Sequence, residues 1–269
     1  MDMTQMNSRG LVLLGCGKMG SAMLQGWLSG GLSPDAVHII DPNPSEWLQG
    51  TGVHINEDLP ESPAILMIAV KPQMMQEALP QVERFGGGDT LILSVAAGTT
   101  IQMYEKAFGA GTRIVRSMPN TPAAVGKGIT AIVGNADATD ADLDMAEDLL
   151  KAIGQVVRLT SEGQIDAVTG ISGSGPAYVF YMIDTLAAAA RAEGLPADMA
   201  MQLAKATVAG AGALAEQADE TPEQLRINVT SPNGTTQAGL EVLMGEGGLA
   251  PLMRKTVAAA THRSRELRK

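Results

Sequence analysis

Short apolar runs alternate with amphipathic stretches along the first half of the chain. The apolar runs predict strands at residues 11–14, 37–40, 64–70, 90–95 and 113–116. The stretches between them have helical periodicity and predict helices at residues 20–28, 74–82 and 100–108. Residues 65–70 and 91–93 are apolar on both faces, as in parallel strands that helices cover on each side. The alternation therefore predicts an α/β fold with an N-terminal Rossmann-type, doubly wound parallel sheet.

Further along, residues 128–133 and 156–159 predict two edge strands around a helix at residues 140–153. From about residue 161 the strand signals disappear. The later helices are predicted at residues 177–193, 197–217, 222–229, 235–244 and 249–267. We therefore expect two domains, an α/β domain over residues 1–160 and an all-helical domain over residues 161–269.

The predicted helical domain has unusually small side chains. Stretches rich in Ala and Gly at residues 186–190 and 209–213 leave little bulk on any helix face. Such faces let the helix backbones of two chains approach closely, which favours a dimerisation domain. The high helix propensity of alanine explains the same composition without a partner, so both interpretations stay open on the residues alone.

Composition and charge narrow the classes of protein. Aromatic residues make up 3% of the chain against 45% hydrophobic residues, so the core has to be aliphatic. The net charge is −10, and only the tail at residues 263–269 is locally basic, which argues against a nucleic acid partner. The longest apolar run, residues 64–70, is far shorter than the roughly 20 residues that span a bilayer. We expect no membrane partner and, since no secretory signal is visible, a cytoplasmic location.

Residues that commonly hold metals or act as nucleophiles are few. Cys16 is the single cysteine, which excludes an internal disulfide. His38 falls in a predicted strand, His54 in a loop and His262 in the last helix, without metal-ligand or catalytic-triad spacing. We therefore expect no metal site.

A glycine-rich turn follows the first predicted strand and opens a helix. It reads Gly15-Cys16-Gly17-Lys18-Met19-Gly20. Glycines at this spacing permit a tight turn, close approach of a pyrophosphate, and close packing of the helix on the strand. The start of the helix then points unpaired amides at the phosphates. The six residues predict a binding site for a dinucleotide.

Asp41 ends the second predicted strand, about 20 residues after the last glycine of the turn. A carboxylate there can accept both ribose hydroxyls of NADH and repels the 2′-phosphate of NADPH. Asp also suits a turn before Pro42, and Asn43 and Ser45 could still coordinate a phosphate. The predicted cofactor is therefore NADPH or NADH, with a mild preference for NADH.

Two further strand ends are candidates for the same site. They read Ala69-Val70-Lys71-Pro72 and Ser94-Val95-Ala96-Ala97-Gly98. The carboxyl ends of strands are where α/β sheets bind ligands. The small residues of the second segment would let the nicotinamide lie against the backbone. A solvated lysine in an ordinary turn is the alternative for Lys71.

A second anion site is predicted in the helical half, at Ser231-Pro232-Asn233-Gly234-Thr235-Thr236. Ser231 suits an N-cap and Pro232 the first helical position. The amides of Gly234, Thr235 and Thr236 would then be free to hold a substrate carboxylate. An ordinary capped helix explains the same residues equally well.

Taken in order, these motifs resemble those of the Δ1-pyrroline-5-carboxylate reductase family. Two further segments carry the resemblance, Arg116-Ser117-Met118-Pro119-Asn120-Thr121-Pro122 and Thr169-Gly170-Ile171-Ser172-Gly173-Ser174-Gly175-Pro176-Ala177-Tyr178. The resemblance covers nearly the whole chain. It implies an oxidoreductase that reduces the C=N bond of pyrroline-5-carboxylate to L-proline with NAD(P)H, the last step of proline biosynthesis. It also implies a homodimer formed by the helical domain, which in many relatives assembles into a ring of dimers.

The resemblance also implies roles for individual residues. Those expected toward the adenosine and ribose are Asn56, Ala69, Val70, Lys71 and Pro72, with Val95, Ala96 and Ala97 nearer the nicotinamide. Those expected around the substrate, in part from the second chain, are Glu162, Asn228, Ser231, Gly234, Thr235 and Thr236. One departure is visible, because many relatives have a Ser-, Arg- or Lys-bearing turn for NADPH where this chain has Asp41.

The implied reaction does not require a strong nucleophile or a metal ion from the protein. An iminium is already electrophilic, so holding the donor and acceptor carbons in contact supplies most of the catalysis. Thr236 is the candidate catalytic residue, through a hydrogen bond between its hydroxyl and the ring nitrogen. Threonine is too weak an acid to supply the proton alone, so water or an already protonated substrate supplies it.

Two other functions fit parts of the pattern. A β-hydroxyacid dehydrogenase or a broader imine reductase would need a lysine in the helical domain, where Lys205 is the only lysine between Lys151 and Lys255. A nucleotide-sensing regulator would bind the cofactor without turnover. Its usual DNA-binding or protein-binding extension is not visible in this sequence.

Overall fold

The computed structural model describes residues 3–268 and divides into two compact units. One unit comprises the chain as far as Gly173 together with the segment that starts at Thr261, and the other is Ser174–Ala260. The division falls later than the boundary predicted near residue 160. The reason is that the segment after residue 160 packs on the sheet: Ile165 is buried in the core, and Asn120 Nδ2 donates a hydrogen bond to the Ser172 carbonyl at 3.1 Å.

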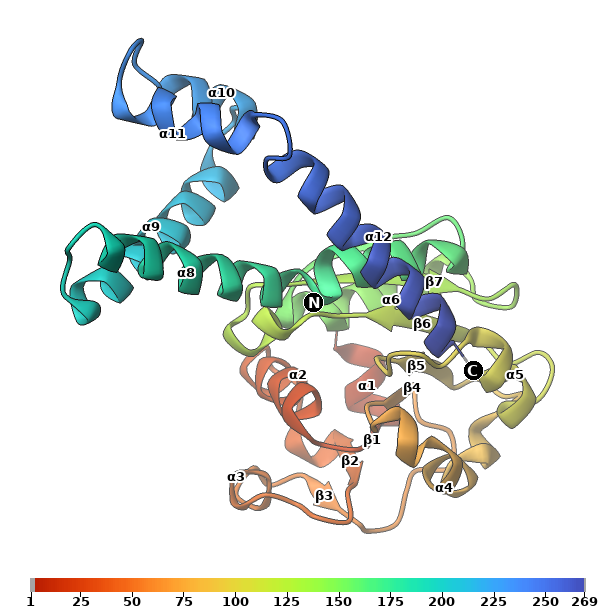
Figure 1. The fold of residues 1–269 in the computed structure, drawn as a ribbon. Coiled ribbons are helices and arrows are strands. Elements are labelled where there is room, and N and C mark those ends of the chain that lie inside the picture. The colour runs from red at the N-terminus through yellow and green to blue at the C-terminus, as the bar shows by residue number, and fades with distance from the viewer. Residues whose placement is uncertain (1–2, 269) are drawn as a thin grey trace. The chain divides into compact units, whose positions relative to one another are not determined.

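The first unit is built on an eight-stranded sheet (Figure 1). Its strands are β1 (Leu11–Leu14), β2 (Val37–Ile40), β3 (His54–Ile55), β4 (Ile65–Ile68), β5 (Leu91–Ser94), β6 (Ile114–Met118), β7 (Gly128–Gly134) and β8 (Gly154–Arg158). Their order is β3-β2-β1-β4-β5-β6-β7-β8, and every neighbouring pair is parallel except β6 with β7. The chain runs outward from β1 to β3 and then returns to the other side of β1. This reversal places the topological switch point, where such sheets bind ligands, between β1 and β4.

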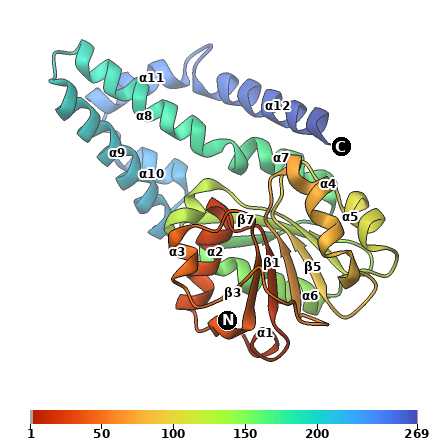
Figure 2. The same cartoon turned by 90° about the horizontal axis from the view of Figure 1, so that it is seen from below.

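Helices cover both faces of this sheet, as Figure 2 shows. They are α1 (Thr4–Arg9), α2 (Lys18–Ser29), α3 (Glu46–Gln49), α4 (Met75–Ala78), α5 (Ile101–Phe108), α6 (Asp140–Leu150) and α7 (Ile165–Val168). Successive residues of β1 point to opposite faces. Leu13 is buried in a cluster with Trp27 of α2, whereas Leu14 is buried in a second cluster with Tyr104 of α5. Helices α1, α2 and α6 cover the first face and α4 and α5 the second, which explains strands that are apolar on both sides.

Three local predictions were wrong. The helix predicted at residues 74–82 is broken into a 3₁₀ turn (Pro72–Met74), α4 and a second 3₁₀ turn (Leu79–Gln81), since Pro80 cannot continue an α-helix. His54 lies in strand β3, paired with His38 of β2, and not in a loop. The strand predicted as an edge at residues 128–133 is β7, which pairs with β6 and with β8.

The second unit is helical throughout, as predicted. Its helices are α8 (Gly175–Ala192), α9 (Ala197–Gln217), α10 (Pro222–Asn228), α11 (Thr235–Met244) and α12 (Leu249–Leu267), the last turns of α12 belonging to the first unit. Within residues 174–260 the buried side chains are those of Ala187, Ala200 and Ala204, while Tyr181 and Val242 are 71% and 77% exposed. A surface with this much exposed apolar area is typical of a protein–protein interface. Across the described residues, no helix is long and apolar enough to cross a membrane.

Candidate active site

The predicted cofactor residues gather at one edge of the sheet. Gly15–Gly20 follow β1, Asp41 follows β2, Asn56 follows β3, Ala69–Pro72 follow β4, and Val95–Ala97 follow β5. These are the carboxyl ends of five parallel strands on both sides of the switch point. The fold thus brings together segments that lie far apart in the sequence, in the place where a dinucleotide binds in sheets of this type.

Each glycine of the turn meets a different geometric requirement. Gly15 has a φ of 87°, and a Cβ atom there would lie 2.8 Å from Val70 Cγ1. A Cβ on Gly20 would lie 2.7 Å from the Gly15 carbonyl oxygen, so only glycine lets α2 pack on the turn this closely. Gly17 caps α2 and has no atom within 4 Å of an added Cβ. The turn is therefore open to a ligand above the start of α2, and a pyrophosphate fits there.

Asp41 ties the end of β2 to this turn. Its Oδ2 accepts a hydrogen bond from the Cys16 amide at 2.7 Å, and its Oδ1 accepts one from the Asn43 amide at 2.8 Å. The backbone of Asp41 is bonded on both sides by the Asn56 side chain, at 2.8 and 3.0 Å. Asp41 is thus a turn residue as well as a negative charge beside the predicted ribose position, and Asn56, whose φ is 54°, holds it in place.

Cys16 is buried inside the same turn. Burial raises the pKa of its thiol; the hydrogen bond with the Ser21 hydroxyl lowers it by less, and the Asp41 carboxylate adds a smaller increase. The thiol therefore stays protonated at neutral pH, and its place is that of a small packing residue.

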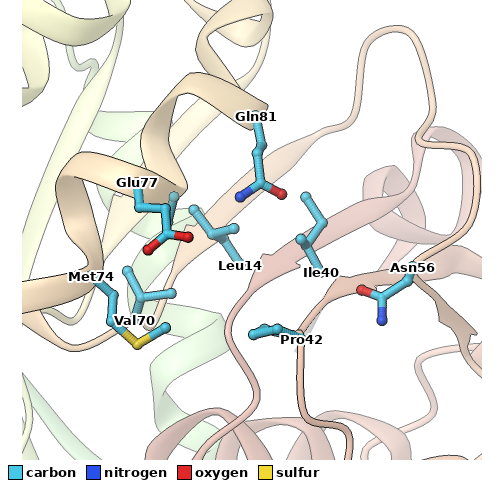
Figure 3. Close-up of a pocket in the computed structure, with 9 residues that line it drawn as sticks. Leu14, Ile40, Pro42, Asn56, Val70, Met74, Glu77 and Gln81 are labelled. Carbon is cyan, nitrogen blue, oxygen red and sulfur yellow. The ribbon is translucent and has the colours of Figure 1, made fainter.

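A cavity of about 190 Å³ lies beyond the turn, at the ends of β1, β2 and β4. It is lined by Leu14, Ile40, Pro42, Asn56, Val70, Met74, Glu77, Ala78 and Gln81. Figure 3 shows Glu77 and Gln81 pointing from the helical segment after β4 toward Leu14 and Ile40. The walls are mostly apolar with a few polar groups, as in pockets for small molecules and cofactors. The lining contains Glu77 and no Lys or Arg, so it offers no positive charge to a 2′-phosphate.

Buried hydroxyl groups support the segment after β5. The Ser94 Oγ accepts a hydrogen bond from the Ala96 amide at 3.1 Å and lies 2.5 Å from the Tyr104 Oη. The Ser117 hydroxyl donates to the Ser94 carbonyl at 2.7 Å. Burial raises the pKa of the Tyr104 phenol, so it remains a neutral hydrogen-bonding group. The sequence had no signal for Tyr104, because it occupies an ordinary apolar position of an amphipathic helix.

Glu162 is already engaged within the first unit. Its Oε1 accepts hydrogen bonds from Arg116 Nη1 at 2.6 Å and from the Ile101 amide, the first of α5, at 2.8 Å. Arg116 is 3% exposed, so Glu162 compensates a buried positive charge and caps a helix. Lys71 is exposed at the start of the 3₁₀ turn Pro72–Met74, where a ligand or solvent can reach it.

The helix at the second predicted anion site starts at Thr235, as its periodicity predicts, and not at Pro232, as the capping residues suggested. Its N-cap is Gly234 and its first residue is Thr235, so the assignment of Ser231 as N-cap and Pro232 as first helical residue was wrong. Residues 231–234 form a turn in which the Gly234 amide donates to the Ser231 carbonyl at 3.0 Å and Asn233 has a φ of 59°. Proline followed by a left-handed Asn is typical of a type II turn. The Gly234 amide is therefore already hydrogen-bonded within the turn, and the prediction that it is free to hold a substrate carboxylate was wrong.

The amides of Thr235 and Thr236 precede the first helical hydrogen bond of α11, which the Ala238 amide donates to the Gly234 carbonyl at 3.2 Å. Both threonines are exposed. Asn228, at the end of α10, accepts a hydrogen bond from Gln224 at 2.8 Å. The free amides and hydroxyls at the start of α11 suit an anion. Among residues 3–268 there is no group of three or more His, Cys, Asp or Glu side chains that could hold a metal ion.

The doubly wound sheet, the open glycine turn at its switch point and the helical unit with an exposed apolar surface define a class of protein, the nicotinamide-dependent oxidoreductases with a helical dimerisation domain. Residues 11–98 match the family model of NADP oxidoreductase, coenzyme F420-dependent, and residues 162–267 match that of pyrroline-5-carboxylate reductase dimerisation.

Full-length comparisons narrow the class. The chain is 36% identical to the pyrroline-5-carboxylate reductase of Methanosarcina acetivorans, over 98% of this chain and 100% of that one, and 34% identical to that of Escherichia coli, over 87% and 89%. It is similar to the solved structure of the enzyme from Coxiella burnetii, with a TM-score of 0.91 and 32% identity over 97% and 99% of the two chains. The Plasmodium falciparum enzyme, solved with NADP bound, has a TM-score of 0.82 and 26% identity over 98% and 99%.

The chain therefore belongs to the pyrroline-5-carboxylate reductase family. Its activity is the reduction of pyrroline-5-carboxylate to proline with a reduced nicotinamide dinucleotide, a step of proline biosynthesis. The dimerisation domain implies a homodimer, which provides a partner for the exposed apolar side chains of the helical unit.

Proposed function

We propose that the carboxyl edge of the sheet binds the whole dinucleotide, with the adenosine in the cavity beside Asn56, the pyrophosphate on the glycine turn, and the nicotinamide on Val95–Ala97. The support is the continuous series of strand ends and the room above Gly17. When bound, the reduced nicotinamide supplies the hydride that reduces the C=N bond. The chain's own contribution is to hold the two reacting carbons in contact.

The substrate carboxylate binds the amides of Thr235 and Thr236 at the start of α11. This is the observation on which the assignment of the substrate site rests, because Gly234 contributes no side chain that would block an anion and both amides precede the first helical bond. The Thr236 hydroxyl oxygen accepts a hydrogen bond from the protonated ring nitrogen and orients the ring. On the family resemblance we also assign Asn228, Ser231 and Glu162 to the substrate site.

Replacing Thr236 by alanine tests this assignment. We expect kcat/KM for pyrroline-5-carboxylate to fall about 10- to 100-fold, because a hydrogen bond to a charged ring is lost, while the affinity for NADPH stays unchanged. Steady-state kinetics and cofactor titration measure the two effects. Thr236→Ser keeps the hydroxyl and should retain most of the activity. Wild-type kinetics in Thr236→Ala would remove this residue from the mechanism.

We infer that Asp41 disfavours NADPH, because its negative charge lies beside the predicted ribose position and the adjoining cavity has no basic residue. Asp41→Ser should raise the ratio of kcat/KM for NADPH to that for NADH by about tenfold, a change of about 1.4 kcal/mol. The measurement is the oxidation rate of each cofactor at 340 nm. Asp35→Ser, which removes an exposed acid before β2, is the control. An unchanged ratio would leave Asp41 as a turn residue only.

The remaining inferences concern assembly and place of action. A ring of dimers is proposed on the family resemblance alone. The cytoplasm is proposed as the place of action because its substrate and cofactors are small, soluble metabolites. Light scattering of the purified protein distinguishes a dimer from a larger ring.

A further inference from the structure

The last turns of α12 belong to the first unit and are fixed there by one buried carboxylate. Asp166 of α7 is 2% exposed. Its Oδ1 accepts a hydrogen bond from the Ser264 hydroxyl at 2.9 Å, its Oδ2 forms an ion pair with Arg268, and the Arg265 Nε lies 4.0 Å from the same oxygen. We call Asp166, Ser264, Arg265 and Arg268 the C-terminal clasp.

The C-terminal clasp is the means by which this carboxylate is compensated. A buried charge needs hydrogen bonds and an opposite charge, or it destabilises the fold. The Ser264 hydroxyl supplies a hydrogen bond to Asp166 Oδ1, and Arg268 supplies the opposite charge beside Oδ2, which accepts no hydrogen bond; both groups lie about a hundred positions away in the chain. The carboxylate therefore determines where the end of α12 lies on the first unit.

The segment held by the clasp forms one wall of a second cavity, of about 330 Å³. The lining residues are Pro72, Gln73, Ala97, Gly98, Thr99, Met103, Thr169, Ser264 and Leu267. The Leu267 carbonyl would be 3.6 Å from a Cβ atom on Gly98, whose φ is 76°. The end of α12 thus packs on the turn after β5 (Figure 1).

The second cavity lies along the same carboxyl edge of the sheet as the proposed adenosine cavity. The adenosine cavity lies at the ends of β1, β2 and β4, whereas this one lies at the ends of β4 and β5, farther along the same edge. A dinucleotide that starts in the first cavity and crosses the glycine turn reaches the second with its nicotinamide half.

We propose that Asp166 is a positioning residue for the nicotinamide half of the cofactor: through the C-terminal clasp it holds Ser264 and Leu267 as the wall against which the nicotinamide is bound. This inference rests on the proposed function only in placing the nicotinamide on Val95–Ala97. It can be tested separately, because loosening the clasp should weaken binding of the nicotinamide half of the cofactor and leave binding of the adenosine half unchanged.

The test compares ligands that differ only in the nicotinamide. Calorimetric titration of wild-type enzyme and of Asp166→Asn measures NADH against ADP-ribose, and NADPH against 2′-phospho-ADP-ribose. We expect Asp166→Asn to lower the affinity for each full cofactor about tenfold, because Ser264 and Leu267 would move and lose contact with the nicotinamide. The affinity for each adenosine-containing fragment should stay within about twofold.

Asp142→Asn is the matched control. Asp142 is also 2% exposed, and it pairs with Arg113 at 2.9 Å just before β6, at the opposite edge of the sheet. Asp142→Asn should destabilise the fold but change the affinities for full cofactor and adenosine-containing fragment equally or not at all. Equal weakening of both ligands by Asp166→Asn, or no weakening of either, would overturn the proposal.

Ser264→Ala keeps the test valid if Asp166→Asn fails to fold. It removes one hydrogen bond of the clasp and should weaken the full cofactors about threefold, again without effect on the fragments. Identical affinities in this variant and the wild type would count against the proposal. Failure of the proposed function has a different signature, because an enzyme that does not reduce pyrroline-5-carboxylate can still show the selective loss of cofactor affinity.

Discussion

Gly15→Ala should raise the dissociation constant for NAD(P)H about 100-fold or more. Two effects combine at this position. The φ of 87° is costly for any residue with a Cβ atom. That Cβ would also lie 2.8 Å from Val70 Cγ1 and 3.2 Å from the backbone of Ala69, so the turn would have to move away from the end of β4. The amides that face the pyrophosphate would move with it. Fluorescence titration of the cofactor measures the loss.

Gly31→Ala is the control for Gly15→Ala, because it introduces the same kind of backbone strain at a position outside the glycine turn. Gly31 has a φ of 95° and no atom within 4 Å of an added Cβ, and it follows the end of α2, away from the glycine turn. Its substitution should cost stability of about 1 kcal/mol and leave the cofactor affinity unchanged. Near-normal cofactor binding by Gly15→Ala would contradict the placement of the pyrophosphate on this turn.

Glu162→Ala should lower the free energy of unfolding by about 3 kcal/mol. It leaves the Arg116 guanidinium, 3% exposed, without its carboxylate, and it removes the acceptor for the first amide of α5. For a chain of this size the loss corresponds to a fall in Tm of about 6–12 °C. Thermal unfolding measures it at fixed protein concentration, because dimerisation contributes to stability.

Two further variants test whether the uncompensated charge of Arg116 causes the loss of stability in Glu162→Ala. Glu147→Ala removes an acid that pairs with Lys151 and Arg158 at the surface, and should cost no more than about 1 kcal/mol. The double variant Arg116→Met/Glu162→Gln removes the uncompensated charge and should regain part of the stability lost in Glu162→Ala. A Tm for Glu162→Ala equal to that of Glu147→Ala would mean that the Arg116 pair contributes little.

Residues with a local signal were predicted well. The bounds of β1, β2, α9, α11 and α12 are those that hydrophobic periodicity and breaking residues indicate. Such patterns depend only on neighbours within a turn or a strand, and the sequence displays them in full. The glycine turn belongs to the same group, because its spacing is a local requirement of one strand–turn–helix unit.

The wrong predictions arose where two local preferences compete. Ser231 before Pro232 is a good helix start, yet Asn233-Gly234 favours a left-handed turn, and the turn prevails so that α11 begins at Thr235. Residues 74–82 have helical periodicity, but Pro80 interrupts them. Ranking such preferences requires the packing around them, which no short window contains.

By itself the sequence determined the doubly wound sheet, the helical second half, the dinucleotide turn and the family. Only the tertiary structure decided that Glu162 neutralises Arg116, that Tyr104 supports the turn after β5, and that Asp166 fixes the end of α12. The physical reason is that backbone periodicity is a property of adjacent residues. The partner of a buried polar group is determined by which strands and helices the fold brings within hydrogen-bonding distance, here across tens of residues.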